Sequence, residues 1–409
     1  MGRRSSDLGP GFSAVLSAAF ITNLGDGLRL AALPLLARTL TSSPLAISGV
    51  TAAQFLPWTT FALVGGVLVD RLDRRRLILT TQTWRAAVMA LLAVAVLTDR
   101  IEIWHLFVVA YVITVGEILV DPSVVAMLPK LVRPHDLDRA NSRITSVETV
   151  TNDFAGGPVG SASFTLAPWL PFAVNAASYL GSTVPFRRLP TIEPTPAERA
   201  AVAERPPLRV ELGEGLRWIR HHPFLRPLTA GIAVFHLGTA GAFSLLVLLV
   251  KDVLDGPDLA FGIALAAAAI GATGSSLLAS RLTERLGRRA VITGAAVVAA
   301  LTVLAAGLAP SLGFLVTVWG LNGAAGGVLL AIGRGFVQRH TPNERLGRTA
   351  IASRSITRTS FVVGALLAGL VADASSVRWS FVVAGSLHLA GALLLWRSFR
   401  FESADAPTW

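Results

Sequence analysis

Long apolar runs are the feature that most limits what this chain can fold into. A helix of about 20 apolar residues crosses a bilayer core about 30 Å thick, and polar loops, prolines and glycines divide the sequence into about twelve such runs. The first half holds runs at residues 12–39, 44–69, 77–97, 103–127, 143–165 and 168–186. The second half holds runs at residues 225–250, 259–280, 290–309, 312–333, 350–372 and 379–397. The sequence therefore predicts an all-α integral membrane protein with twelve transmembrane helices.

Composition agrees with a membrane protein. Of the 409 residues, 53% are hydrophobic and 15% are charged, whereas a soluble domain carries about 25% charged residues. The chain has no cysteine, which excludes disulfides, thiolate metal sites and a cysteine nucleophile.

The placement of basic residues predicts the orientation of the chain. The net charge is +11, but the basic residues fall in short clusters between apolar runs and not in one patch or stripe, so we expect no nucleic-acid partner. If the runs cross the membrane alternately, the loops on one side contain only four basic residues, namely Arg38, Arg100, Lys251 and Arg378. The positive-inside rule then places the other loops and both termini in the cytoplasm. We expect a multi-pass protein of the plasma or inner membrane.

A polar stretch divides the chain into two halves of six runs. We expect an N-terminal bundle at 1–186, a cytoplasmic linker at 187–224 and a C-terminal bundle at 225–409. Within the linker, Thr195–Glu198 has the pattern of a helix-capping box, and one apolar stripe consists of Leu208, Leu212, Leu216 and Ile219. This pattern predicts an amphipathic helix on the inner membrane surface. A regulatory or partner-binding role is the alternative.

The two halves repeat one motif. Asp70–Arg75 follows the second run and Glu284–Arg289 follows the eighth, and both read acid, Arg, Leu, any residue, Arg, Arg. Parallel repeats of six helices are typical of transporters, whose site lies between the halves near mid-membrane.

Motifs of common enzymes and pumps are missing from the sequence. A phosphate-binding Walker A loop requires a Gly-Lys pair. The chain has two lysines, Lys130 and Lys251, and neither follows a glycine, so this loop is absent. No His-Glu pair begins a zincin motif, and no Gly-x-Ser-x-Gly elbow occurs. We therefore expect no enzyme activity, no cofactor and no bound metal, and we expect energy to come from an ion or substrate gradient.

The loop after the second run resembles the signature of the major facilitator superfamily. The signature residues present here are Gly66, Asp70, Arg71, Arg74 and Arg75, whereas Asp73 stands where the family usually has glycine. Further stretches resemble the branch of proton-linked drug, macrolide and enterobactin exporters: Asn23–Asp26, Asp121–Pro122, Leu128–Pro129, Ala140–Ser142 and Gln338–Pro342. The Gly157–Pro158 pair matches the antiporter motif only in part.

This resemblance implies a function and a gate. It implies a monomeric secondary transporter that exports small amphipathic compounds by proton antiport through alternating access. A siderophore or metabolite exporter and a proton-coupled uptake symporter of the same fold remain alternatives. In the resembled family the signature loop latches the outward-facing state against the eleventh helix. Gly66 would allow close helix approach, and Asp70 would accept backbone N–H groups at a helix N-terminus.

Ionisable residues within the apolar runs are the candidates for proton coupling, because charges at membrane depth are costly and usually functional. Asp26 and Arg29 lie three residues apart and are expected to pair on one helix face. Glu117 and Asp121 lie four apart and project to one side of the fourth run. Glu117 is the leading proton carrier, because it lies deeper and has no cation on its own helix. Asp26 is second, and Asp121 has an ion pair with Arg71 or Arg74 as its alternative role.

The remaining candidates concern the substrate cavity. We expect the cavity to be lined by Asn23, Asp26, Arg29, Glu117, His236, Trp319 and Asn322. For His236 and Trp319, hydrogen-bonded or aromatic packing is the alternative. We expect His388 to be a bystander.

Overall fold

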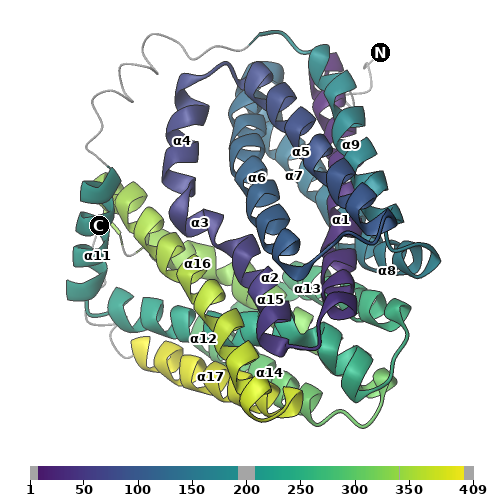
Figure 1. The fold of residues 1–409 in the computed structure, drawn as a ribbon. Helices are drawn as coiled ribbons and strands as arrows, with labels where there is room; N and C mark the ends of the chain where they lie inside the picture. Colours follow the sequence, from purple (N-terminus) through teal and green to yellow (C-terminus); the bar gives the residue numbers. More distant parts are fainter. Residues whose placement is uncertain (1–7, 192–207, 340, 400–409) are drawn as a thin grey trace, which may run out of the picture. The chain divides into compact units, whose positions relative to one another are not determined.

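The computed structural model describes residues 8–191, 208–339 and 341–399, and these contain helices but no strand. In the first half the helices are α1 (Pro10–Leu40), α2 (Pro44–Phe55), α3 (Pro57–Thr60), α4 (Ala62–Arg71), α5 (Arg74–Leu97), α6 (Ile103–Leu131), α7 (Leu137–Glu148), α8 (Gly156–Leu166) and α9 (Leu170–Arg187). In the second half they are α11 (Leu208–His221), α12 (Leu225–Leu248), α13 (Asp258–Leu286), α14 (Arg288–Gly307), α15 (Leu312–Arg339), α16 (Asn343–Ala374) and α17 (Val377–Ser398). Figure 1 shows their order along the chain.

Short non-α turns join some of these helices. A 3-10 turn at Pro134–Asp136 precedes α7, a π-helix at Thr149–Ala155 joins α7 to α8, and another at Leu249–Val253 extends α12. The fifth predicted run, residues 143–165, is therefore not one regular helix, because the π-turns interrupt its hydrogen-bond ladder.

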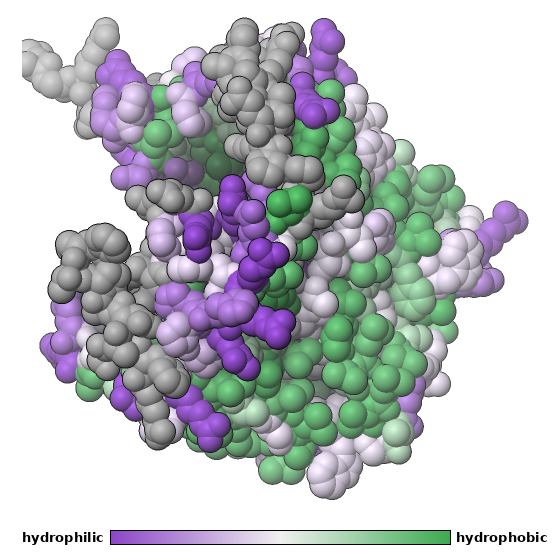
Figure 2. Space-filling model, turned by 90° about the vertical axis from the view of Figure 1, so that its left-hand side faces the viewer, coloured by the Kyte–Doolittle hydropathy of each residue, from purple (hydrophilic) through white to green (hydrophobic). Residues whose placement is uncertain are grey.

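Eight helices among the described residues are long and apolar enough to cross a membrane, and a ninth span results if the broken pair Pro44–Thr60 and Val64–Arg71 counts as one. The helix α1 is not among the eight, and it carries Asp26, Arg29 and Arg38. Figure 2 shows hydrophobic side chains in broad areas of the surface, as expected where helices face lipid.

The chain forms two compact units. One consists of residues 1–36 and 60–205, and the other of residues 37–59 and 206–409. The end of α1 and all of α2 thus group with the C-terminal helices, a division that differs from a simple cut at the linker. The helix α2 lies along α16, where the Phe55 and Phe361 rings stack with centroids 4.6 Å apart.

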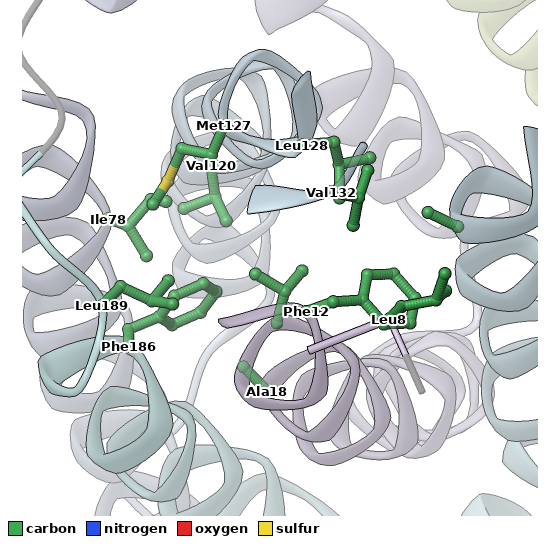
Figure 3. Packing of buried hydrophobic residues seen from close by; sticks show 12 residues of the cluster. Leu8, Phe12, Ala18, Ile78, Val120, Met127, Leu128, Val132, Phe186 and Leu189 are labelled. Atoms are coloured by element: carbon green, nitrogen blue, oxygen red, sulfur yellow. The ribbon is translucent and has the colours of Figure 1, made fainter. Parts of the chain in front are cut away.

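The N-terminal unit has a continuous apolar core. It contains Phe12 of α1, Ile78 of α5, Met127 of α6 and Phe186 of α9, each at most 3% exposed (Figure 3).

The helices α1 and α8 of the same unit are in direct backbone contact, without side chains between them. A Cβ on Gly27 would lie 2.7 Å from the Cα of Gly156, so these two glycines permit backbone contact.

In the C-terminal unit, small residues allow close helix contacts beside a core of larger side chains such as Phe224 and Leu228. Gly364 lies against Leu237, where an added Cβ would come within 2.7 Å of the Leu237 Cα. Ala240 and Ala365 are fully buried together with Ala52 of α2. This close packing of small residues is the usual way in which membrane helices associate.

The repeated signature loops fold differently in the two halves. In the first loop, Asp73 caps α5 by accepting a 2.7 Å hydrogen bond from the Arg76 N–H. In the second loop, the equivalent Gly287 has φ +78 and alone joins α13 to α14. Asp73 needs no glycine-like conformation, because it has φ −61 and its carboxylate supplies the cap.

The two adjacent glycines of α4 differ in what surrounds them within the N-terminal unit, and the expected approach of another helix at Gly66 stays a prediction. A Cβ on Gly66 would meet nothing within 4 Å, whereas one on its neighbour Gly65 would lie 2.6 Å from Ile118 Cγ2. The face of α4 that carries Gly65, rather than Gly66, is therefore turned towards α6. Elsewhere in the signature, Asp70 is half-buried, Arg71 is exposed and Arg74 is buried, while Arg75 Nη2 donates a 2.5 Å hydrogen bond to the Arg187 carbonyl.

The linker helix exists, but its expected apolar stripe is only partly correct. Ile219 is 5% exposed, whereas Leu216 is 40% exposed. The buried face runs through Gly215, whose Cβ would meet the backbone of Arg348 at the start of α16. The helix α11 packs through this glycine, so the buried line shifts away from Leu216. The capping-box residues Thr195–Glu198 and the side chains of Leu208 and residues 333–340 lie outside the described part of the chain.

Candidate functional site

A cluster of charged side chains lies inside the N-terminal unit. Arg29 Nη2 donates a 2.7 Å hydrogen bond to Glu117 Oε1, and Arg29 Nε lies 3.6 Å from Asp26 Oδ1. The Arg29 side chain is 3% exposed, whereas those of Asp26 and Glu117 are 13% and 22% exposed. Residues from α1 and α6 therefore meet, and the two carboxylates share one buried guanidinium.

Arg85 of α5 completes the cluster. Its Nη2 lies 3.4 Å from Asp26 Oδ1 and 3.5 Å from Glu117 Oε1, so it also reaches both carboxylates. The same nitrogen donates a 2.7 Å hydrogen bond to the Tyr179 hydroxyl of α9. Tyr179 in turn donates to Asp26 Oδ1, and its ring lies 4.0 Å from the Arg85 guanidinium carbon. Two arginines thus face two carboxylates, and the cluster is electrically balanced.

Uncharged groups extend this network on one side. Arg85 Nη1 donates a 3.1 Å hydrogen bond to Gln82 Oε1. The Gln82 amide then donates to the hydroxyls of Thr22 and Ser182, each at 3.1 Å. Gln82, Ser182 and Tyr179 are completely buried. These buried groups fix the position of the Arg85 guanidinium through its hydrogen bonds to Gln82 and Tyr179.

Local sequence explains how these side chains fit. Arg29 follows Asp26 by three positions, which places both on one face of α1. Gly116 precedes Glu117, and a Cβ there would lie 2.5 Å from Arg85 Cδ. The glycine therefore leaves the space that the Arg85 side chain occupies.

The cluster is not fully satisfied by hydrogen bonds. Arg29 Nη1 is buried and has no hydrogen-bond partner among the described residues. An unpaired donor of a buried guanidinium is costly. The site therefore has unused capacity to bind water or a polar group beside Glu117.

Other expected residues of the N-terminal unit lie outside this network. Asp121 is exposed one turn from Glu117. Asn23 Nδ2 donates a 2.8 Å hydrogen bond to the Ala19 carbonyl of its own helix. Asn23 thus satisfies its donor locally, and Asp121 is the more accessible carboxylate.

The C-terminal unit holds a second, aromatic group. The Arg358 guanidinium lies 4.7 Å from the Trp58 ring centre and 5.7 Å from that of Phe55. The His236 ring lies 5.3 Å from Phe361, and its Nδ1–H donates to the Ile232 carbonyl at 2.7 Å. His236 therefore belongs to a partly exposed group of flat side chains and not to an acidic pair.

Two expected cavity residues make packing contacts within the C-terminal unit. Trp319 is 5% exposed and packs edge-on against Phe381. Asn322 Nδ2 donates to the Ala299 carbonyl and to the Thr302 hydroxyl of α14, both at 3.1 Å. Within the C-terminal unit Trp319 is enclosed and the Asn322 amide joins two helices, which favours the packing role over the cavity for Trp319. His388 is 1% exposed and lies 3.1 Å from the Thr239 hydroxyl.

Sequence reasoning missed Arg85 and Tyr179. The signals were present: Arg85 is a charge inside the third apolar run, and the chain has only two tyrosines. It also expected Glu117 to be less closely paired than Asp26. In the structure Arg29 lies nearer to Glu117 than to Asp26, because the cation comes from a neighbouring helix that spacing within α6 does not reveal.

Known proteins resemble this chain along most of its length. Macrolide efflux protein A of Streptococcus pyogenes is 23% identical over 87% of each chain. Multidrug efflux pump Tap of Mycolicibacterium fortuitum is 25% identical over 90% of each. The solved structure of the nucleoside transporter NupG superposes with a TM-score of 0.78 at 14% identity, covering 95% of this chain and 99% of the other.

A bacterial homologue of the iron transporter ferroportin, in its inward-facing state, also superposes, with a TM-score of 0.71 at 16% identity over 95% of this chain and 98% of the other. At these identities the solved structures show a shared fold only. The family model described as "Transmembrane secretion effector" matches residues 9–407. The chain is therefore a multi-pass membrane transporter, not an enzyme, and belongs to the transmembrane secretion effectors of the major facilitator superfamily.

Proposed function

We propose that this protein exports small amphipathic compounds through twelve membrane-spanning helices by proton antiport. The observation that carries the proposal is the buried cluster in which Arg29 and Arg85 each reach both Asp26 and Glu117. Charges at membrane depth are retained where they serve transport, and a carboxylate within such a cluster is a suitable proton carrier. The efflux relatives support export as the direction.

Proton binding would change the pairing within the cluster. Glu117 now accepts the 2.7 Å hydrogen bond from Arg29, and its side chain is the more exposed of the two carboxylates. A proton on Glu117 would neutralise it and weaken that contact. Arg29 would then turn towards Asp26, which already lies 3.6 Å away. Glu117 is therefore the proposed coupling residue, Asp26 is the proposed counter-ion, and exposed Asp121 is a proposed relay.

The aromatic group of the C-terminal unit supports an amphipathic substrate. Phe55, Trp58 and Phe361 present flat apolar surfaces, and Arg358 adds one charge beside them. His236 contributes a further ring. Such surfaces bind apolar rings with little demand on hydrogen-bond geometry, a property that suits varied substrates.

The proposed orientation follows from the charge of the loops. Most arginines lie in loops that the positive-inside rule assigns to the cytoplasm, together with both termini. Because the chain has no cysteine, single cysteines can report this orientation. A cysteine replacing Arg100 should react with an impermeant thiol reagent added to intact cells, whereas one replacing Arg285 should not.

The direct test is proton movement in proteoliposomes that contain the purified protein and a trapped pH dye. Adding a transported macrolide or cationic dye should move protons in the opposite direction to substrate. Co-directional movement would identify an uptake symporter, and no proton movement with active transport would refute coupling. A panel that includes siderophores would decide between drug export and siderophore export.

A further inference from the structure

A pocket lies between the linker helix α11 and the start of α16, within the C-terminal unit. It encloses about 460 Å³ and is lined on α11 by Glu214, Arg217 and Trp218 and on α16 by Arg345, Arg348 and Thr349. All of these residues belong to the C-terminal unit. Among the described residues that line it, three arginines face one glutamate, which gives these residues an excess of positive charge.

The charged side chains are held in place around the pocket. Arg348 Nη1 donates to Glu214 Oε2, which joins the two helices. The Arg345 guanidinium lies 4.4 Å from the Trp218 ring centre, in a cation–π arrangement. Arg217 is exposed on α11. Arg348 is thus paired with a carboxylate, whereas among the described residues no ion pair is seen for Arg217 or Arg345.

Two buried polar atoms in the pocket wall lack partners. The Thr349 hydroxyl and the Trp218 indole N–H have no hydrogen-bond partner among the described residues, and Thr349 is 0% exposed. Leaving such groups unpaired is costly, and native sites usually satisfy them with a ligand, an ion or water. An anion with several oxygens would provide acceptors for both, once Arg345 turns from the indole towards the anion.

The surroundings indicate a lipid as the source of this anion. The pocket lies where the candidate membrane span Arg345–Ala374 begins, and α11 leads into the span that starts at Leu225. Two apolar side chains of α11, Val210 and Leu216, are 42% and 40% exposed. These apolar side chains are placed to contact acyl chains beside a headgroup.

We propose that this pocket binds the phosphate of an anionic phospholipid headgroup. Arg217 and Arg345 supply the charge, Thr349 supplies a hydroxyl, and Arg348 remains paired with Glu214. Basic pockets at the cytoplasmic ends of membrane helices bind such headgroups. The inference rests on the proposed orientation, which places α11 at the inner leaflet, but it requires neither proton coupling nor export.

The test measures lipid binding to the purified full-length protein in detergent by native mass spectrometry. The lipids are phosphatidylglycerol and, as a zwitterionic comparison, phosphatidylcholine. We expect the wild type to retain phosphatidylglycerol selectively. The double variant R217Q/R345Q should weaken this binding roughly 100-fold, since a charge-assisted hydrogen bond contributes about tenfold or more. The matched control R281Q/R285Q removes two exposed arginines from α13 and should bind as the wild type does.

Two further arms make the result decisive. Thr349→Val keeps the shape of the buried side chain and should weaken binding about threefold to tenfold, because it removes the hydroxyl that contacts the phosphate; unchanged binding would remove Thr349 from the site. Inorganic phosphate is titrated separately; binding of free phosphate in this pocket without retention of phosphatidylglycerol would overturn the lipid assignment. Equal lipid binding by R217Q/R345Q and the wild type would overturn the site. Transport plays no part in this assay, so its outcome is independent of the proposed function.

Discussion

The interiors of the two units differ in how they use polar groups. The fully buried arginines among the described residues, Arg29, Arg74 and Arg85, all lie in the N-terminal unit. In the described part of the C-terminal unit, the buried polar residues are serines, threonines and His388. The N-terminal unit thus concentrates charge where proton chemistry is possible. The described interior of the C-terminal unit is otherwise apolar, with close helix contacts such as that at Gly364 and aromatic rings such as Phe55 and Phe361.

The largest expected effect comes from removing a charge of the N-terminal cluster. Arg85→Met keeps much of the side-chain volume but leaves Asp26 and Glu117 with one arginine. We expect the free energy of unfolding to fall by about 3–5 kcal/mol, because breaking a buried ion pair leaves an uncompensated charge. The measurement is thermal unfolding of the purified protein in detergent.

The matched control for this variant is Arg281→Met, at an exposed position of α13. It should change the free energy of unfolding by less than about 0.5 kcal/mol. Equal losses in the two variants would show that the cluster contributes nothing specific to stability.

A smaller effect is expected from the C-terminal unit, where packing and not charge is critical. Gly364→Ala would place a Cβ 2.7 Å from the Leu237 Cα, and backbone atoms cannot yield as a flexible side chain does. We expect a loss of about 1–3 kcal/mol. Gly294→Ala in α14 meets nothing within 4 Å and should be neutral or stabilising by up to about 1 kcal/mol. A neutral Gly364→Ala would argue against close packing of α12 and α16.

The smallest effect on stability is expected for His388, a buried histidine of the C-terminal unit. His388→Gln removes a buried ring that contacts the Thr239 hydroxyl and the Ala384 carbonyl. We expect a loss of about 1 kcal/mol in stability, but an unchanged dependence of transport on the external pH. Transport by this variant is measured across pH 6 to 8 beside the wild type. A displaced pH profile would assign proton chemistry to the C-terminal unit as well and would remove the contrast between the two units.

The sequence was sufficient for much of the fold. Apolar runs separated by polar loops correspond closely to helices, as at 103–127 against Ile103–Leu131 for α6. They did not reveal the break within Pro44–Arg71 or the π-turn before Gly156, because hydropathy does not report local hydrogen bonding. The close contact of Gly65 with α6 was also hidden, since a pair of glycines does not show which one faces a given neighbouring helix.

The candidate site was only partly predictable. Asp26, Arg29 and Glu117 are recognisable as charges inside apolar runs, and their helical spacing indicates which residues share a face. Their partners are set by packing between helices that are distant in sequence, such as Arg85 with Glu117. The role of Trp319 was left open for a related reason: an aromatic residue in a span has the same sequence signature whether it faces a cavity or a core.

The central claim is that Glu117 carries the coupling proton, and transport into inside-out vesicles tests it most directly. We expect wild-type vesicles to concentrate substrate when the vesicle lumen is made more acidic than the outside, because protons that leave the lumen then drive substrate into it. Glu117→Gln should lose this gradient-driven accumulation at least tenfold, yet retain downhill exchange, which needs only the conformational change. The control is Asp258→Asn. The Asp258 carboxylate lies 2.7 Å from Lys251 Nζ, outside the cluster, so vesicles with this variant should accumulate substrate as the wild type does. Full accumulation by Glu117→Gln would contradict the claim.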